Sequence, residues 1–333
     1  MKSSVCVTGG AGYVGSQTVW ALRDRGVPVV VYDNLSTGHR EHLPPDVPVV
    51  VGDVRDEAAL QNCFAKHKVR AVVHCAAVAL VGESMRAPSM YWSINVGGTA
   101  ALTGAAMACG VKAIVFSSSA AVYGEALQIP INERHPKEPI NPYGRSKHVA
   151  EQVLEDARAA GGPAWIAFRY FNAAGGDSKG RTGEDHEPET HLIPNILKVA
   201  QSMKQGGVVS PVKLFGGDYP TEDGTCERDY IHTEDLAEAH IRGVEYLLAG
   251  GQSGAFNLGT GQGRSLLAMV RAARTVTGVD IPYQITARRP GDPAQLVADA
   301  DLAWQELGWR AKNSSLRHIL DTAWRWMQRG DGA

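Results

Sequence analysis

The chain of 333 residues lacks the features that would tie it to an oxidising compartment, a membrane or a nucleic acid. Its five cysteines are odd in number, scattered and never spaced as C-x-x-C, which favours the reduced thiols of a cytoplasmic protein. The net charge of -2 gives no basic field for nucleic acid or anionic lipid. No apolar run is long enough to span a bilayer, and no signal-peptide core follows Met1.

What the sequence does have is a regular alternation of strand and helix patterns through its first half. Short, β-branched runs of the kind found in strands buried on both faces alternate with segments of helical spacing. We expect strands at residues 4–8, 27–32, 47–51, 71–75, 113–117 and 165–170, and helices at residues 15–25, 57–67, 87–109 and 143–160. This order predicts an α/β protein with a Rossmann-type, doubly wound parallel sheet.

A glycine-rich turn joins the first expected strand to the first helix. Gly10, Gly12 and Gly15 fit G-x-G-x-x-G, which allows a tight turn and a close approach of the backbone to a pyrophosphate. The helix N-terminus adds free N–H groups and the positive end of its dipole. The next strand ends in Asp33, whose carboxylate suits the ribose 2′-OH and repels a 2′-phosphate, so we expect NAD rather than NADP. Asp53 either reaches the adenine or is only a turn residue.

Beyond Asn172 the pattern becomes irregular, with loop-like stretches at residues 175–188 and 216–224 and strand-like pieces at 229–232 and 255–258. We therefore expect residues 1–172 to form the NAD-binding Rossmann domain, with return segments near 229–260. Residues 173–333 are expected to form a smaller α/β region that binds the substrate.

The pair Tyr143 and Lys147 is a candidate for acid–base chemistry. If Pro142 opens a helix, the two side chains lie one turn apart on one face. A nearby ammonium favours the phenolate and lowers the pKa of a tyrosine. The alternative is a solvated surface pair. Ser117 to Ser119 end the expected strand 113–117, where side chains of open α/β sheets meet the ligand crevice.

With these motifs together, the chain resembles the extended branch of the short-chain dehydrogenase/reductase superfamily, and most closely the family of UDP-glucose 4-epimerases. The resemblance runs nearly end to end, through residues 8–15, 32–36, 81–84, 95–96, 116–124, 141–147, 169–172, 215–225, 228–232, 257–259 and 288–292. It implies a homodimer with bound NAD and a UDP-sugar substrate.

The resemblance also assigns roles to residues. Ser119, Tyr143 and Lys147 become the catalytic set. The NAD-binding set becomes Gly9, Gly12, Tyr13, Val14, Gly15, Asp33, Asn34, Asp53, Val54, Cys75, Ala76, Asn95, Ser117, Tyr143, Lys147 and Tyr170. The substrate-binding set becomes Ser119, Tyr143, Asn172, His191, Leu192, Phe215, Arg228, Arg288, Asp292 and Leu296. Arginines suit a diphosphate, although Arg228 and Arg288 could instead pair with Asp229 and Asp292.

Three positions qualify this assignment. Ala79 stands where many members carry a lysine near the cofactor, and His191 stands where the best-known members have asparagine. Leu296 matches the residue that lines the sugar pocket, and its size favours plain hexoses over N-acetylated ones. His186 and His191 lie in a segment with Pro188, which bars the helix that a His-Glu-x-x-His zinc site needs, so no metal is expected.

The reaction follows from what is missing beside Ser119. Related dehydratases and decarboxylases place an acid there for elimination, whereas this chain has Ala120 and Ala121. We therefore expect inversion of the C4 hydroxyl of a UDP-hexose (UDP-glucose and UDP-galactose) through a transient 4-keto sugar, in galactose metabolism or polysaccharide precursor supply. The alternatives are a UDP-xylose/UDP-arabinose or UDP-GlcNAc 4-epimerase, a reductase that releases NADH, and an NAD-binding sensor or scaffold.

Overall fold

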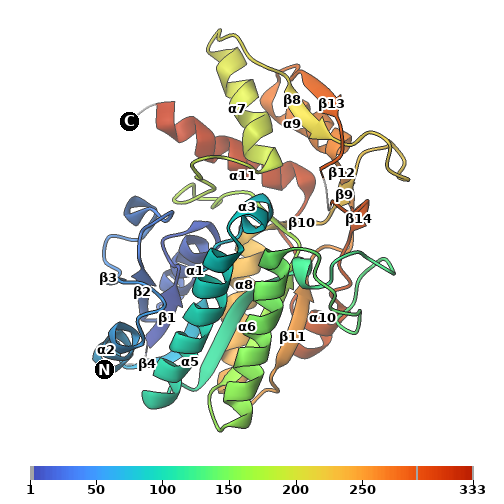
Figure 1. The fold of residues 1–333 in the computed structure, drawn as a ribbon. Helices are drawn as coiled ribbons and strands as arrows, with labels where there is room; N and C mark the ends of the chain where they lie inside the picture. The colour runs from blue at the N-terminus through green and yellow to red at the C-terminus, as the bar shows by residue number, and fades with distance from the viewer. Residues whose placement is uncertain (1–3, 290–291, 332–333) are drawn as a thin grey trace.

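The computed structural model describes residues 4–289 and 292–331 and is built around a seven-stranded parallel sheet (Figure 1). The strand order is β11-β6-β5-β4-β1-β2-β3. Its strands are β1 (Ser4–Thr8), β2 (Val29–Asp33), β3 (Val49–Val51), β4 (Val69–His74), β5 (Ala113–Ser119), β6 (Ala164–Tyr170) and β11 (Gly254–Leu258). The strand order steps outward in both directions from β1, which confirms the predicted doubly wound sheet.

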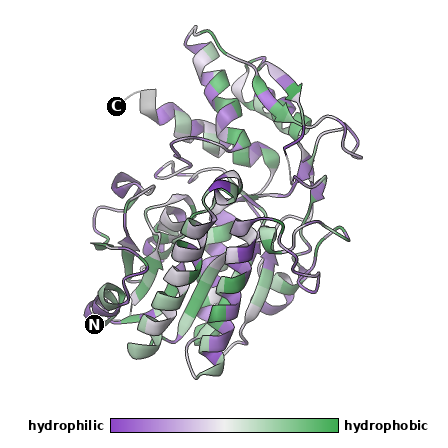
Figure 2. Ribbon diagram, viewed as in Figure 1, coloured by the Kyte–Doolittle hydropathy of each residue, from purple (hydrophilic) through white to green (hydrophobic). Residues whose placement is uncertain are grey.

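Helices cover both faces of this sheet. They are α1 (Tyr13–Asp24) and α8 (Thr233–Leu248) on one face, and α2 (Glu57–His67), α5 (Gly98–Ala108) and α6 (Pro142–Ala159) on the other. Alternate strand residues supply the two cores: Val5 and Val7 pack beneath α1, while Cys6 packs beneath α2. Figure 2 shows hydrophobic residues concentrated along these strands.

The expected helix at residues 87–109 is interrupted. The chain forms α3 (Val81–Arg86), α4 (Pro88–Tyr91), a π-helical turn (Trp92–Gly97) and then α5. Within that turn Asn95 is buried and bonds to the loop that follows β4. Such π-turns often mark functional positions, and the spacing of apolar residues gave no sign of it.

The smaller lobe has its own core, formed by residues beyond 173. Its helices are α7 (Leu192–Lys204), α9 (Leu266–Thr277) and α11 (Leu316–Met327), beside the paired strands β8 (Val212–Phe215) and β13 (Tyr283–Thr286). Short strands join the lobes: β7 (Asn172–Ala174) with β10 (Tyr230–His232), and β9 (Glu227–Arg228) between β12 (Arg264–Ser265) and β14 (Gln295–Leu296). The helix α10 (Asp301–Leu307) returns to the large lobe.

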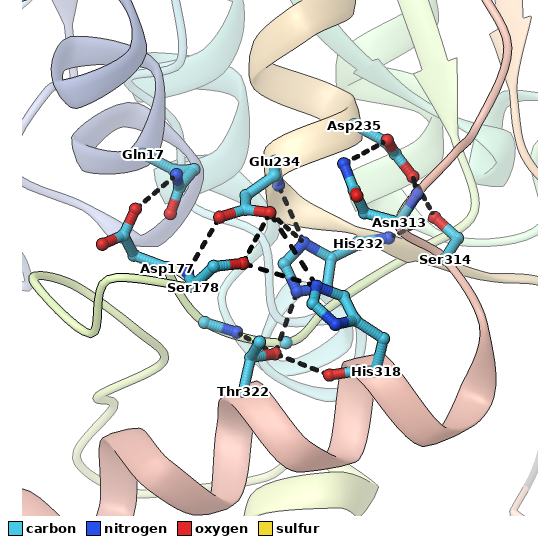
Figure 3. A network of polar contacts seen from close by, with 12 residues as sticks. Gln17, Asp177, Ser178, His232, Glu234, Asp235, Asn313, Ser314, His318 and Thr322 are labelled. Atoms are coloured by element: carbon cyan, nitrogen blue, oxygen red, sulfur yellow. Dashed lines mark hydrogen bonds and ion pairs between the residues drawn. The ribbon is translucent and has the colours of Figure 1, made fainter. Parts of the chain in front are cut away.

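A polar network fixes the two lobes against each other (Figure 3). His232 Nε2 lies 2.9 Å from Thr322 Oγ1 on α11, and the Ser178 hydroxyl donates to Glu234 of α8 at 2.9 Å. Because His232 and Thr322 are buried, these bonds are shielded from water and hold α11 on the large lobe. Among the described residues, no helix is long and apolar enough to cross a membrane.

Candidate active site

The glycine turn between β1 and α1 is shaped for a ligand. A Cβ on Gly15 would lie 2.1 Å from Gly9 O, so this glycine serves the packing of the turn itself. A Cβ on Gly12 would meet only Gly9 O, at 3.4 Å, so the protein itself gives little steric reason for a glycine there. The first turn of α1 carries no acidic residue. Gly12 therefore leaves room for a pyrophosphate at a positive helix end, and the turn fits a dinucleotide.

Asp33 ends β2 beside this turn, as predicted. Its carboxylate accepts from Ala11 N at 2.9 Å and from Leu35 N at 2.8 Å, which aims it across the mouth of the turn. Asn34 caps the following bend by accepting from Ser36 N. Asp53 accepts hydrogen bonds from the backbone and side chain of Arg55, so it is a turn residue in this structure. The next residue, Val54, is buried.

Asn95 stabilises the wall of the predicted cofactor site. Its amide donates to Val78 O at 3.0 Å and to Ser146 Oγ at 2.9 Å, and it accepts from Val78 N at 2.9 Å. Both N–H groups are therefore used to tie the loop after β4 to α6. Cys75 and Ala76 begin that loop, and Ala76 backbone lies against Gly9. The Tyr13 hydroxyl donates to the carbonyl of Gly175, which follows β7.

The helix α6 places the catalytic candidates. Asn141 caps it by accepting from Gly144 N at 2.8 Å, and Pro142 occupies its first turn, as predicted. Ser119 ends β5, and its hydroxyl accepts from Ala121 N. Burial raises the pKa of Tyr143, and a hydrogen bond with Ser119 offsets this only in part. The structure thus brings Ser119 and Tyr143 together, but burial outweighs the lowering of the tyrosine pKa that the sequence predicted.

Lys147 lies one turn further along α6 and is buried. Its ammonium donates to Ser117 O at 2.8 Å and lies over the ring of Phe116. Burial lowers the pKa of Lys147 to about 8. The charge of Glu151 offsets this lowering in part, so the ammonium is still largely charged near neutral pH, and Lys147 is buried rather than part of a solvated surface pair.

A cavity of about 460 Å³ lies in the small lobe. Six residues predicted to bind substrate line it: Asn172, His191, Leu192, Phe215, Arg228 and Asp292. Arg228 donates to Pro293 O at 2.9 Å and lies 3.3 Å from Asp292 Oδ1. The cavity thus combines an aromatic ring, an apolar wall and a buried guanidinium, which suits a base and a phosphate.

Arg288 faces elsewhere in this structure. Its guanidinium pairs with Asp218 at 2.7 Å and stacks on Tyr219. The adjacent Arg289 lines the cavity instead and lies over Phe215. Neither predicted partner, Asp229 or Asp292, holds Arg288. Pro290 and Gly291 of the same motif lie outside the described residues.

Leu296 of β14 does not line this cavity, although its strand partner Arg228 does. It packs on a small apolar cluster with Ala120 and Val122, the residues that follow Ser119. Phe171 packs on the same cluster. A role for Leu296 in lining the sugar pocket stays a prediction.

His191 opens α7 beside two buried acids. Its Nδ1 lies 2.6 Å from Glu184 and 3.4 Å from Glu189, whose side chains are only 9% and 4% exposed. Burial lowers the pKa of His191, but the hydrogen bonds that its ring donates to Glu184 and Glu189 have the larger effect and raise the pKa to about 10. An imidazolium therefore forms part of the cavity wall at neutral pH.

With His186, these side chains bring four donor atoms within 4.8 Å of one another. The segment is not helical, as Pro188 predicted, yet the fold still gathers them. In this structure Glu184 and His191 form a charged hydrogen bond of 2.6 Å.

Several residues of the site escaped the sequence analysis. Arg289 and Asn195 line the cavity, and Glu184 and Glu189 hold His191. The sequence offers two adjacent arginines at 288–289 and no means to decide which faces inward. The two acids lie in an irregular segment, where no periodicity indicates burial.

The glycine turn, the acid that ends β2 and the set Ser119, Tyr143 and Lys147 together define a dinucleotide-dependent enzyme of the short-chain dehydrogenase/reductase class. Within that class, the chain belongs to the NAD dependent epimerase/dehydratase family, whose model matches residues 5–259. A UDP-glucose 4-epimerase of Halalkalibacterium halodurans is 48% identical over 323 residues, which are 97% of this chain and 95% of the relative.

Solved structures agree with this placement. The crystal structure of UDP-glucose 4-epimerase from Brucella ovis in complex with NAD matches with a TM-score of 0.93 at 44% identity, covering 97% of this chain and 98% of that chain. UDP-glucose-4-epimerase from Stenotrophomonas maltophila, with bound NAD and formylated UDP-arabinopyranose, matches with a TM-score of 0.93 at 39% identity, covering 99% of both chains.

Proposed function

We propose that this protein inverts the C4 hydroxyl of a UDP-sugar with NAD as its cofactor, and that UDP-glucose and UDP-galactose are its main pair. The observation that carries the proposal is the hydrogen bond between Ser119 at the end of β5 and Tyr143 of α6, with Ala120 and Ala121 next in the chain after Ser119. This arrangement supplies a proton acceptor for a sugar hydroxyl without the acid that elimination needs. The relatives named UDP-glucose 4-epimerase support it.

Tyr143 acts as the base in this mechanism. Its phenolate takes the proton of the C4 hydroxyl, and Ser119 orients that hydroxyl or relays the proton. NAD held by the glycine turn, Asp33 and Lys147 would supply the hydride acceptor and donor for C4 and a positive charge that favours the phenolate. Lys147 adds a second positive charge within one helical turn.

The small lobe anchors the substrate. The cavity with Phe215, Arg228 and His191 holds the UDP, so that the keto sugar can turn over without leaving. Closure around the sugar excludes water, which protects the ketone from loss. We assign the NAD contacts to the glycine turn, Asp33, the loop from Cys75, Ser117, Lys147 and Tyr170. Arg288 and Leu296 remain proposed substrate contacts.

A panel of UDP-sugars tests the reaction. With catalytic amounts of NAD, UDP-glucose should give UDP-galactose at equilibrium, read by chromatography. Stoichiometric consumption of NAD or NADH would instead identify a reductase, and binding of NAD without turnover would identify a sensor. The retained Tyr143 and Lys147 favour the enzyme. UDP-xylose and UDP-arabinose belong in the panel because a structural relative holds a formylated UDP-arabinopyranose.

We further propose that the protein is a cytoplasmic homodimer. All five cysteines are unpaired in the structure, as expected in a reducing compartment. The expected interface is formed by the segment from α4 to α5 and by α6. Trp92 and Met107 of that segment are exposed apolar side chains that a partner would cover.

A further inference from the structure

A histidine that belongs to none of the predicted sets lies behind the end of β5. His240 of α8 is fully buried. Its Nδ1 lies 2.7 Å from Leu236 O, one turn back on the same helix, and its Nε2 lies 2.9 Å from Ser117 Oγ. Ser117 is one of the predicted NAD contacts, so the histidine touches the cofactor site from the far side.

The bond to Leu236 fixes the tautomer of His240. A carbonyl oxygen can only accept, so Nδ1 must carry the ring hydrogen. Burial lowers the pKa of His240 to about 4, so the ring is neutral at physiological pH and Nε2 is a pure acceptor. The Ser117 hydroxyl must then donate its single hydrogen to His240.

This donation leaves Ser117 Oγ with lone pairs only. Its remaining neighbours carry hydrogens: Cys75 Sγ lies 3.2 Å away, and burial raises the pKa of this thiol to about 11, so it stays protonated. Burial also raises the pKa of Tyr170, and a hydrogen bond with Ser117 offsets it in part. The thiol and the phenol can therefore both donate to Ser117, whose carbonyl accepts from Lys147.

We propose that His240 is a positioning residue of the cofactor site, which fixes Ser117 as a hydrogen-bond acceptor and through it orients Cys75 and Tyr170. The proposal rests on the proposed function, because Cys75, Ser117 and Tyr170 are assigned to NAD there. His240 touches neither substrate nor cofactor in this scheme and acts only through Ser117.

The first test reads the tautomer in the unmodified protein. Nitrogen-15 NMR of the histidine side chains should show His240 neutral, with hydrogen on Nδ1 and none on Nε2. A ring protonated on Nε2 would overturn the proposal, because Ser117 would then accept from His240 and lose its fixed direction. This measurement needs no variant and does not depend on turnover.

The second test compares three variants. His240→Leu removes the acceptor, His240→Gln keeps one in similar volume, and Ser117→Ala removes the hydroxyl. An unpaired buried hydroxyl should cost about tenfold in NAD retention and in kcat. His240→Gln should recover most of the loss, while calorimetric affinity for UDP stays within about twofold. His240→Leu combined with Ser117→Ala should lose no more than Ser117→Ala alone, because Ser117→Ala already removes the hydroxyl through which His240 acts.

His232→Leu is the matched control. His232 is also a buried histidine at α8, but it bonds Thr322 at the lobe junction (Figure 3). It should lower Tm and leave NAD per folded chain unchanged. Equal losses in His240→Leu and His240→Gln, or additive losses with Ser117→Ala, would reduce His240 to a packing residue and overturn the proposal. If the unmodified protein carries no NAD and inverts no UDP-sugar, the proposed function fails instead.

Discussion

At the scale of single residues, charge in the substrate cavity depends on two buried acids. The carboxylates of Glu184 and Glu189 are largely shielded from water, and the protonated ring of His191 is an ion-pair partner of both. The imidazolium joins Arg228 and Arg289 along the cavity wall. Asparagine, which the best-known members of the resembling family carry at this position, would bring a hydrogen bond but no charge.

Glu184→Gln should make UDP binding depend on pH. In the unmodified protein the pKa of His191 is about 10, so UDP affinity should be flat from about pH 7 to 9 as far as this group is concerned. Without Glu184 the pKa moves down toward its ordinary value, and affinity should fall about tenfold as pH rises through that range. Calorimetry with UDP checks this. Uridine, which lacks phosphate, should bind to Glu184→Gln with the same affinity at every pH. Asp185→Asn, a change at the neighbouring acid, is the control and should leave the pH dependence of UDP binding as in the unmodified protein.

The free energy of unfolding should also fall as pH rises through the pKa of His191. Because the pKa of His191 is raised in the folded chain, its ion pair stabilises fully below the ordinary histidine pKa, and the contribution is lost as pH rises through about 10. A UDP affinity of Glu184→Gln that matches the unmodified protein at every pH would contradict a charged His191.

Leu296 should set the size of the sugar that is accepted. It packs beside Ala120 and Val122, so an N-acetyl group on the sugar would overpack a filled site at about 1–3 kcal/mol. UDP-glucose should therefore have a higher kcat/KM than UDP-GlcNAc, and pentoses should be tolerated. Leu296→Gly should shift this ratio toward UDP-GlcNAc. Equal efficiencies in the unmodified protein would show that Leu296 is no steric gate.

At the scale of elements, the turn between β1 and α1 separates two reasons for glycine. Gly12→Ala places a methyl where the pyrophosphate is expected and meets only Gly9 O at 3.4 Å. Gly15→Ala places one 2.1 Å from Gly9 O, inside the turn. The first should lower NAD affinity about tenfold or more with little change in Tm. The second should lower Tm by about 1–2 °C for each kcal/mol of strain.

Released nucleotide and thermal unfolding, measured on both variants, separate the two effects. Full NAD content in Gly12→Ala would mean that no pyrophosphate approaches that glycine. An unchanged Tm in Gly15→Ala would mean that the turn relaxes at no cost.

Elements with strong local patterns could be predicted from the sequence, and contacts between distant segments could not. The helix Glu57–His67 and the strand Ser4–Thr8 have the predicted bounds, because helical spacing and a run closed by glycine are local signals. The interruption at Asn95 follows from bonds to Val78 and Ser146, which periodicity does not contain. Arg289 and His240 were missed for the same reason: Phe215 and Ser117, which they contact, lie on other elements.

At the scale of the whole molecule, the exposed apolar side chains around α5 and α6 bear on assembly. Trp92 and Met107 are 38% and 41% exposed. We expect a dimer that buries about 1,200 Å² or more in total and covers them. Light scattering at assay concentration should give twice the chain mass, and Met107→Lys with Trp92→Lys should give monomers. A monomeric mass for the unmodified protein would contradict the dimer.

We expect the large lobe to carry the catalytic residues and the small lobe to bind the UDP. A variant in each lobe tests this: one should lose turnover and the other should lose UDP affinity. Every residue that lines the cavity comes from positions 172–292, whereas Tyr143 and the glycine turn belong to the large lobe. Tyr143→Phe deletes only the base, so kcat should fall about a hundredfold or more. Its UDP affinity and NAD content should not change.

Arg228→Gln removes a buried guanidinium from the anchor, so UDP affinity should fall about tenfold or more while NAD content stays full. Calorimetry with UDP, release of bound nucleotide and turnover of UDP-glucose give the three measurements for each variant. Near-normal turnover in Tyr143→Phe would place the base elsewhere, and loss of NAD in Arg228→Gln would mean that the lobes do not bind their ligands separately.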